Sequence, residues 1–252
     1  MTARLDGVTV DVTARRRQRV RVLDDVTLDL PAGSMIALVG ESGCGKSMVA
    51  AAICGLLPPG SSVTGRLALG DDAFLGDEIG GRDPRWRVVR GRRVGFVPQS
   101  AATSFTPVRT LGSQLDEVIA GLDGARDAVE LCHAVHLDPH ALRLYPHELS
   151  GGMAQRAAIA AALAGGPEVL VADEPTSALD PDLAAAIWAL LTETARRGAA
   201  VLVITHDMDT LGRAGCDSVA VMRAGRIVEH RAPADLAASD DEYVSAFFEP
   251  VA

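Results

Sequence analysis

The only lysine of this chain lies in a glycine-rich octapeptide. Lysine and arginine together number 24, and all but Lys46 are arginine. The octapeptide fits the pattern GxxxxGK followed by Ser or Thr, in which backbone N–H groups surround phosphates, the lysine reaches the β- and γ-phosphates and the last hydroxyl ligates Mg²⁺. A compact ammonium suits such a narrow cradle better than a planar guanidinium. We therefore expect nucleotide phosphates to bind to Gly40, Glu41, Ser42, Gly43, Cys44, Gly45, Lys46 and Ser47.

The residues around this octapeptide predict the strand and the helix that such a loop needs. Met35–Val39 is a continuous apolar run, which is typical of a buried strand in a parallel sheet. Ser47–Leu57 is expected to form a helix, whose N-terminus adds partial positive charge toward bound phosphate. A chance glycine-rich turn is the alternative, and the strand, the helix and the single lysine together disfavour it.

A second apolar run supplies acidic side chains. Val169–Ala172 ends in Asp173, Glu174 and Pro175, and proline cannot continue a strand ladder. Asp173 can hold Mg²⁺ through water, and Glu174, expected on the other side of the strand, can polarise an attacking water. An Asp-Glu pair alone is usually a solvated strand end, but beside a phosphate loop it indicates phosphoryl chemistry.

A third apolar run, Val201–Ile204, leads to His206. Ligands of open α/β sheets collect at the carboxyl ends of the strands, where all three runs deliver their polar residues. A histidine after a strand is commonly an ordinary surface or core residue. Next to the other two motifs, we expect His206 to contact the γ-phosphate and Glu174.

A further motif gives the sequence its family resemblance. Leu149–Arg156, which reads LSGGMAQR, resembles the LSGGQ signature of ATP-binding-cassette (ABC) ATPases. The resemblance extends over about residues 5–230. The other motifs follow in that family's order, as a Walker A loop at Gly40–Ser47, a Q-loop at Gln99, a Walker B strand ending at Asp173 and Glu174, a D-loop at Ser177–Asp180 and a switch histidine at His206.

This resemblance implies ATP and Mg²⁺ as cofactors and ATP hydrolysis as the activity. Two ABC ATPase subunits, identical or paralogous, are expected to pair head to tail, so that the signature of one covers the ATP held by the other. The implied nucleotide contacts in the signature are Ser150, Gly151 and Gly152. The implied Mg²⁺ ligands are Ser47, Gln99 and Asp173. The implied catalytic residues are Lys46, Gln99, Glu174 and His206.

The resemblance also implies the fold, an α/β RecA-like P-loop NTPase core with an antiparallel β subdomain and a helical signature subdomain. A single ABC ATPase domain is expected over residues 1–252. Residues of about 1–98 and 160–235 would form the core and the β subdomain, about 99–159 the helical subdomain, and 236–252 a C-terminal tail. Further predicted elements are helices at Leu111–Ala120, Ala125–Val135 and Gly151–Ala164, a strand at Val94–Val97, and a hairpin of Val219–Met222 with Arg226–Val228.

Two stretches resemble one branch of the family, the peptide and nickel importer ATPases. They are Gln99–Pro107 and Leu144–Met153, although Ser100 and Ala101 stand where that branch has an acidic residue and proline. We therefore expect an importer subunit for a peptide or a nickel or metal chelate. It would dock through a groove near Gln99–Pro107 onto separate permease subunits, with an extracytoplasmic solute-binding protein as an indirect partner. A soluble regulatory ATPase and an exporter subunit are the alternatives.

Composition and charge indicate where in the cell the chain is expected to act. The net charge of −9 argues against nucleic-acid binding, and no apolar run approaches the roughly 18 residues of a membrane span. The N-terminus lacks a signal-peptide pattern, and four scattered cysteines favour a reducing compartment. The expected location is therefore the cytoplasmic face of the cell membrane, as a peripheral subunit.

Two arginine-rich stretches and one group of cysteine and histidine residues each allow both a functional and a simpler interpretation. The family resemblance implies an aromatic residue before the Walker A loop that stacks on the adenine, but no aromatic residue precedes Phe74. Arg17 is therefore expected to stack on the adenine in its place, and a solvated basic run is the equal alternative. Cys132, His136 and His140 have helical spacing for a soft metal, but Pro139 should break the helix, and packing or surface roles are favoured. The arginines between positions 82 and 93 are expected to form a solvated connection.

Overall fold

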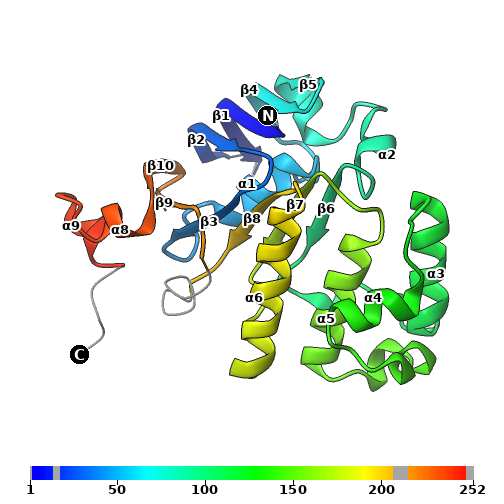
Figure 1. The fold of residues 1–252 in the computed structure, drawn as a ribbon. Helices are drawn as coiled ribbons and strands as arrows, with labels where there is room; N and C mark the ends of the chain where they lie inside the picture. The colour runs from blue at the N-terminus through cyan, green and yellow to red at the C-terminus, as the bar shows by residue number, and fades with distance from the viewer. Residues whose placement is uncertain (1, 14–17, 207–214, 248–252) are drawn as a thin grey trace.

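Two sheets organise the chain (Figure 1), and the computed structural model describes residues 2–13, 18–206 and 215–247. The first sheet is antiparallel with the order β2-β1-β4-β5. Its strands are β1 (Ala3–Thr13), β2 (Arg19–Leu30), β4 (Ser62–Leu69) and β5 (Asp72–Leu75). The second sheet has the order β10-β9-β3-β8-β7-β6. Its strands are β3 (Met35–Gly40), β6 (Val94–Val97), β7 (Val169–Asp173), β8 (Ala200–Ile204), β9 (Ser218–Arg223) and β10 (Arg226–Arg231).

The second sheet is parallel except for β10, which pairs antiparallel with β9 in the predicted hairpin. Every residue of β3, β7 and β8 is buried, because a parallel sheet is covered on both faces. The predicted apolar runs are thus confirmed as strands of one sheet. Because they are parallel, their carboxyl ends and the polar residues that follow meet at one edge.

Alternate residues of these strands point into two separate cores. In β3, Met35, Ala37 and Val39 belong to the core shared with the helices, whereas Ile36 and Leu38 belong to the core shared with the antiparallel sheet. Helix α1 (Lys46–Ile53) lies in the second core, and α6 (Pro181–Arg196) covers the opposite face of the parallel sheet (Figure 1). This two-sided packing holds the edge that carries the phosphate loop on a rigid support.

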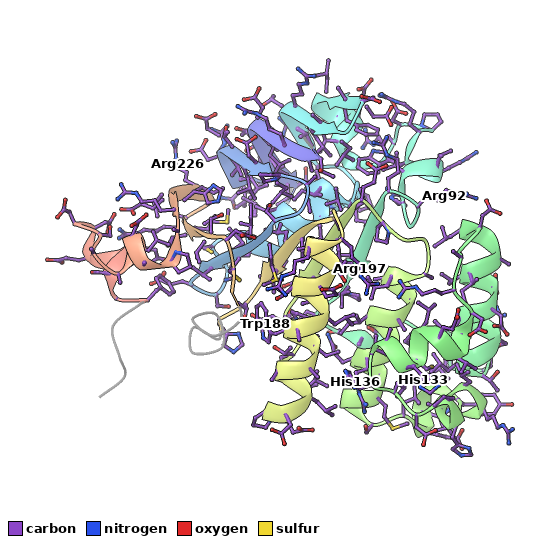
Figure 2. All side chains as sticks on the ribbon, in the orientation of Figure 1. Arg92, His133, His136, Trp188, Arg197 and Arg226 are labelled. Atoms are coloured by element: carbon purple, nitrogen blue, oxygen red, sulfur yellow. The ribbon has the colours of Figure 1, made fainter. Side chains whose placement is uncertain are left out.

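A helical segment is inserted between the neighbouring strands β6 and β7. It contains α3 (Leu111–Leu122), α4 (Ala128–Ala134) and α5 (Gly151–Leu163). Helix α4 begins three residues later than predicted because Asp127 caps it, its side chain accepting a hydrogen bond from the amide of Glu130 at 2.8 Å. Histidines 133 and 136 lie on α4 and the turn after it (Figure 2). No group of three metal-ligating side chains is found within the described ranges.

Helix α1 stops at Ile53, four residues before the predicted end. Gly55 turns the chain with φ of 64°, and a Cβ there would lie 2.4 Å from the ring of Trp86. Trp86 belongs to the short helix α2 (Trp86–Val89) and is fully buried. The end of the helix is therefore set by a side chain that is distant in sequence.

The expectation that the arginines between positions 82 and 93 form a solvated connection is wrong for Arg85, Arg90 and Arg93, whereas Arg82 and Arg87 are exposed. Arg85 pairs with Asp83 at 2.7 Å, and Arg93 pairs with Asp72 at 2.5 Å and Glu168 at 3.2 Å. Arg90 donates from Nε to the carbonyl oxygen of Cys54 at 3.1 Å. These side chains join the antiparallel sheet and the end of α1 to the parallel sheet.

The segment after β10 packs against the parallel sheet. It forms α8 (Pro233–Leu236) and α9 (Glu242–Ser245), which bury Leu236 and Val244 completely. Ser239 Oγ also donates to Glu229 Oε1 on β10 at 2.5 Å. Throughout the portion of the chain that the structure describes, no helix is long and apolar enough to cross a bilayer.

Candidate active site

A cleft of about 420 Å³ lies at the carboxyl edge of the parallel sheet. The phosphate loop, β7 and β8 all contribute to it, as the sequence predicts. Of the predicted residues, the cleft is lined by Gly40, Ser42, Gly43, Gly45, Lys46, Ser47, Gln99, Asp173, Glu174 and His206. Val22, Met48 and Ile204 line it as well. Val22 was not foreseen, because its strand is brought to the loop only by the packing of the two sheets.

The phosphate loop needs glycine for two different reasons. At Gly40, φ is 150° and a Cβ would lie 2.2 Å from the carbonyl oxygen of Met222 on β9. At Gly43, φ is 80° and a Cβ would meet nothing within 4 Å, so that only the backbone conformation requires glycine. The loop ends at Gly45, which is the N-cap of α1. The first amides of α1 have no partners inside the helix and can bind phosphate oxygens.

Lys46 lies folded back over this loop. Its Nζ donates to the carbonyl oxygens of Gly40 at 2.7 Å and Glu41 at 2.9 Å. The Glu41 side chain is exposed, and Cys44 is buried in the core below the loop. These two predicted members of the loop do not line the cleft.

Asp173 ends β7 beside Ser47. It is 5% exposed, and burial raises the pKa of its carboxyl, while a hydrogen bond with Ser47 and the charge of Lys46 act in the opposite direction. Asp173, Ser47 and Gln99, which carry a carboxylate, a hydroxyl and an amide oxygen, line one cleft. Mg²⁺ prefers such oxygen ligands and takes one or two carboxylates together with phosphate oxygens. This donor set fits the predicted ion.

Glu174 does not lie on the opposite side from Asp173, as strand alternation predicted. It has left-handed backbone geometry with φ of 51°, which turns its side chain into the same cleft. His206 Nδ1 donates to Glu174 Oε1 at 2.7 Å, and the Glu174 side chain is 11% exposed. The backbone is held by Ile204, whose carbonyl oxygen accepts from the Glu174 amide at 2.9 Å. An unfavourable backbone angle costs about 1–3 kcal/mol, and such residues cluster at functional sites.

The signature residues are not part of this cleft. Ser150 caps α5, its hydroxyl accepting from the amide of Met153 at 3.2 Å. A Cβ at Gly152 would lie 3.2 Å from the carbonyl oxygen of Ala178. The beginning of α5 is therefore packed against the predicted D-loop. Arg17, the predicted adenine contact, lies outside the described residues.

An apolar groove of about 380 Å³ lies between the parallel sheet and the helical segment. It begins next to the predicted Q-loop, at Pro98, and includes Ser104 and Phe105. Its other apolar contributors include Leu56, Phe96, Val118 and Leu122. The groove is at the place where the sequence predicts a docking site.

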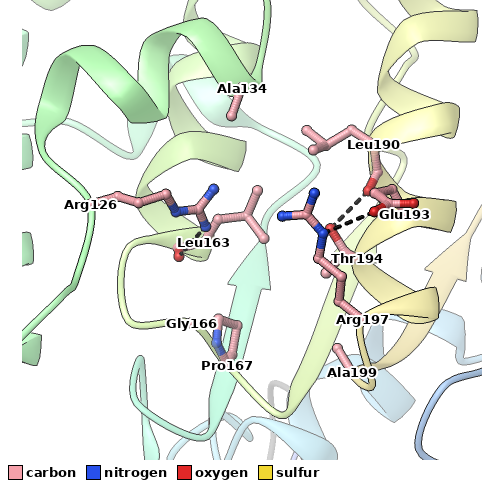
Figure 3. A pocket seen from close by; sticks show the side chains of 10 residues that line it. All are labelled: Arg126, Ala134, Leu163, Gly166, Pro167, Leu190, Glu193, Thr194, Arg197 and Ala199. Carbon is pink, nitrogen blue, oxygen red and sulfur yellow. Dashed lines mark hydrogen bonds and ion pairs between the residues drawn. The ribbon is translucent and has the colours of Figure 1, made fainter.

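A separate hollow, also of about 380 Å³, lies between α5 and α6 (Figure 3). Arg126 and Arg197 extend toward it from opposite sides. Arg126 donates to the carbonyl oxygen of Leu163 at 3.2 Å, and Arg197 pairs with Glu193 at 2.9 Å. Arg126 thus binds a carbonyl at the end of α5, and Arg197 forms an ion pair within α6 and its cap. We assign this hollow a structural role.

Comparison with known proteins places this geometry in a family. The profile of the ABC transporter family matches residues 23–177. The probable peptide ABC transporter ATP-binding protein y4tR of Sinorhizobium fredii is 42% identical over 226 residues, covering 86% of this chain and 66% of that protein. The probable D,D-dipeptide transport ATP-binding protein DdpD of Escherichia coli is 39% identical over 228 residues, covering 86% and 68%. The oligopeptide transport ATP-binding protein OppD of Salmonella typhimurium is 39% identical over 222 residues, covering 84% and 64%.

Solved structures agree with these relatives. A dimeric ATP-binding cassette in a post-hydrolysis state with ADP and Pi has a TM-score of 0.77 and 26% identity, covering 91% of this chain and 98% of that one. The chain spans about two thirds of the length of the curated relatives that it matches. A profile that matches more than half of the chain, with relatives at this level of identity, establishes that the chain belongs to the ABC transporter family, among the ATP-binding-cassette ATPases of its peptide-transport branch.

Proposed function

We propose that this chain hydrolyses ATP as the nucleotide-binding subunit of a membrane importer, at the cytoplasmic face of the membrane. The observation that carries the proposal is the single cleft in which the phosphate loop, Lys46, Asp173 and the Glu174–His206 pair meet. The printed names of the relatives favour a peptide or dipeptide as the solute. A metal chelate, the other solute that the sequence resemblance implies, is an outcome to be tested.

The cleft provides a division of labour for phosphoryl transfer to water. The amides of the phosphate loop and Lys46 hold the β- and γ-phosphates and offset their charge. Ser47, Gln99 and Asp173 would hold Mg²⁺, which supplies Lewis-acid stabilisation of the phosphate oxygens. Glu174 orients the attacking water and accepts its proton, which is general-base catalysis.

His206 keeps the general base in place. Because Glu174 has a strained backbone angle and is buried on most sides, its carboxylate needs a partner that fixes its direction. The His206 N–H at 2.7 Å supplies one and leaves the second carboxylate oxygen for water. His206 is 75% exposed at the mouth of the cleft, where it is also placed to meet a γ-phosphate.

A second chain completes the site. Ser150, Gly151 and Gly152 begin α5 away from the cleft of their own chain, and the helix N-terminus provides a second anion site. We propose that the signature of a partner ABC ATPase covers the ATP. The dimeric cassette solved with ADP and Pi supports this arrangement.

Docking to membrane subunits uses the apolar groove beside the predicted Q-loop. Its position between the sheet and the helical segment allows a bound permease helix to move the two relative to each other. Leu56, which is 45% exposed on its rim, and Phe105 are proposed contacts for such a helix. A permease pair and, through it, a solute-binding protein complete the proposed importer.

Affinity purification of the tagged chain from membranes of its own cells, followed by an ATPase assay, tests the proposal. We expect permease subunits to co-purify, together with Mg²⁺-dependent phosphate release that a cognate solute stimulates. Peptide and metal-chelate uptake in a deletion strain then separate the two solute classes. A complex that never consumes ATP contradicts the enzymatic role, and recovery of soluble partners alone supports a regulatory ATPase.

A further inference from the structure

A tyrosine near the end of the described chain contacts the beginning of the phosphate loop. The hydroxyl of Tyr243, on α9, accepts a hydrogen bond from the backbone amide of Glu41 at 3.2 Å. The same hydroxyl donates to the carbonyl oxygen of Met222, the last buried residue of β9, at 3.1 Å. One side chain thus joins α9, the phosphate loop and the central sheet.

This bridge begins where the strand pairing ends. β3 and β9 pair in parallel up to Gly40 and Met222, and the chain then turns into the loop. The hydroxyl of Tyr243 spans from Met222 to Glu41, one residue beyond the last strand pair. It therefore extends the fixed part of the sheet by one residue into the loop.

The peptide that Tyr243 fixes is also one that orients the lysine. Glu41 has its amide bound to Tyr243 and its carbonyl oxygen bound to Lys46 Nζ at 2.9 Å. The carbonyl of Gly40, which forms one planar peptide unit with the Glu41 amide, supplies the other acceptor for Nζ at 2.7 Å. A change in the position of Glu41 consequently moves an acceptor of the ammonium that holds phosphate.

The tyrosine is itself held on several sides. The Arg223 guanidinium lies 4.7 Å from the ring centroid of Tyr243, and the Phe247 ring meets it edge-on at 5.2 Å. The adjacent Val244 is fully buried. Burial also raises the pKa of Tyr243 above its ordinary value. The hydroxyl of a tyrosine carries its proton at neutral pH and can both donate and accept.

We propose that Tyr243 is a positioning residue for ATP binding, which acts by fixing the Glu41 peptide and, through it, Lys46. The proposal rests on the proposed function, because it assumes that the loop binds ATP. It assigns part of the phosphate site to the segment after β10, which the sequence predicts to be only a tail. A purely structural role would instead tie α9 to the sheet without affecting the loop.

Tyr243→Phe tests this directly, because phenylalanine keeps the ring contacts and loses only the hydroxyl. The Kd for ATP should rise about two- to twelvefold, which corresponds to the net contribution of one hydrogen bond, about 0.5–1.5 kcal/mol. Ser245→Ala is the matched control, since it removes a hydroxyl on the same helix that donates to the carbonyl oxygen of Glu242 and not to the phosphate loop. Val244→Ala is the second control, because it loosens the packing of α9 and keeps the Tyr243 hydroxyl.

The two readouts are ATP affinity, by displacement of a fluorescent ATP analogue, and hydrogen exchange of the loop amides. We expect Tyr243→Phe to weaken ATP binding and to speed exchange at Glu41, with both unchanged in Ser245→Ala. The inference is overturned if wild type and Tyr243→Phe bind ATP equally well. It is also overturned if Val244→Ala lowers Tm by the same amount as Tyr243→Phe and weakens ATP binding by the same factor. If wild type itself fails to bind ATP, the proposed function is overturned together with this inference.

Discussion

Replacing Glu174 by glutamine removes the general base and leaves the size of the side chain unchanged. Glutamine keeps the size of the side chain and can still accept the His206 N–H that now lies 2.7 Å from Oε1. It cannot take a proton from the attacking water at neutral pH. Positioned general bases contribute about 10²–10⁴-fold, so kcat should fall by that factor while ATP still binds. The ATP-bound dimer should accumulate.

A double-mutant cycle with His206 gives a second, sharper magnitude. A hydrogen bond to a charged group is worth about 1.5–3 kcal/mol, and exposure of His206 places this one at the lower end because water screens it. His206→Ala should therefore lower kcat about tenfold in wild type. In the Glu174→Gln background the same change should lower it little further, because the base on which His206 acts is already absent.

Phosphate release at saturating Mg²⁺ and ATP would be measured for wild type, both single variants and the double variant in the assembled complex. Glu193→Gln is the matched control, since it makes the same substitution on α6, away from the cleft, where Glu193 is in an exposed pair with Arg197. Size-exclusion chromatography with ATP would report the trapped dimer. Turnover by Glu174→Gln at close to the wild-type rate would refute the general-base assignment. Losses that simply multiply in the double variant would refute the claim that His206 acts through Glu174.

Four further substitutions test three separate parts of the structure. Lys46→Ala should weaken ATP binding rather than kcat alone, because it removes the ammonium that holds phosphate; an unchanged Kd from nucleotide titration would contradict this. Gly40→Ala should lower the free energy of unfolding by about 3 kcal/mol or more, because the backbone is strained and the new Cβ would lie 2.2 Å from Met222. Gly43→Ala should lower it by about 1–2 kcal/mol, because only its φ is unfavourable. Equal losses of the two variants in urea unfolding would contradict the predicted clash at Gly40. Burial lowers the pKa of His230, so the folded state binds this proton less tightly than the unfolded chain does. The free energy of unfolding should therefore fall as the pH drops from about 6.5 through the folded-state pKa of His230. His230→Gln should flatten that part of a curve of Tm against pH.

Short sequence patterns were sufficient to predict the strands that carry the candidate site. The runs Met35–Val39, Val169–Ala172 and Val201–Ile204 are apolar without alternation, and each is followed by polar or glycine-rich residues. Strands of this kind belong to a covered parallel sheet. Their carboxyl ends must then meet, which brings Lys46, Asp173 and His206 into one cleft. Composition and spacing within a dozen residues carried all of this information.

Other features depended on residues that are distant in the sequence. Trp86 occupies the space above Gly55 and so ends α1 early. Asp72 and Glu168, which lie on or beside other strands, bind Arg93 and make part of the arginine-rich stretch a structural joint. Neither result can be read from a local pattern, because the partner that decides it is brought close only by the packed sheets.

The amino-acid sequence by itself thus determined the family, the phosphate loop and which site residues follow the carboxyl ends of the parallel strands. Only the tertiary structure decided that Glu174 turns into the same cleft as Asp173, through a backbone angle of 51°, and that Tyr243 reaches Glu41 across 202 residues. The physical reason is the same in both cases. Periodicity records which face of its own element a residue occupies, whereas a strained turn or a hydroxyl bridge exists only once separate elements have packed together.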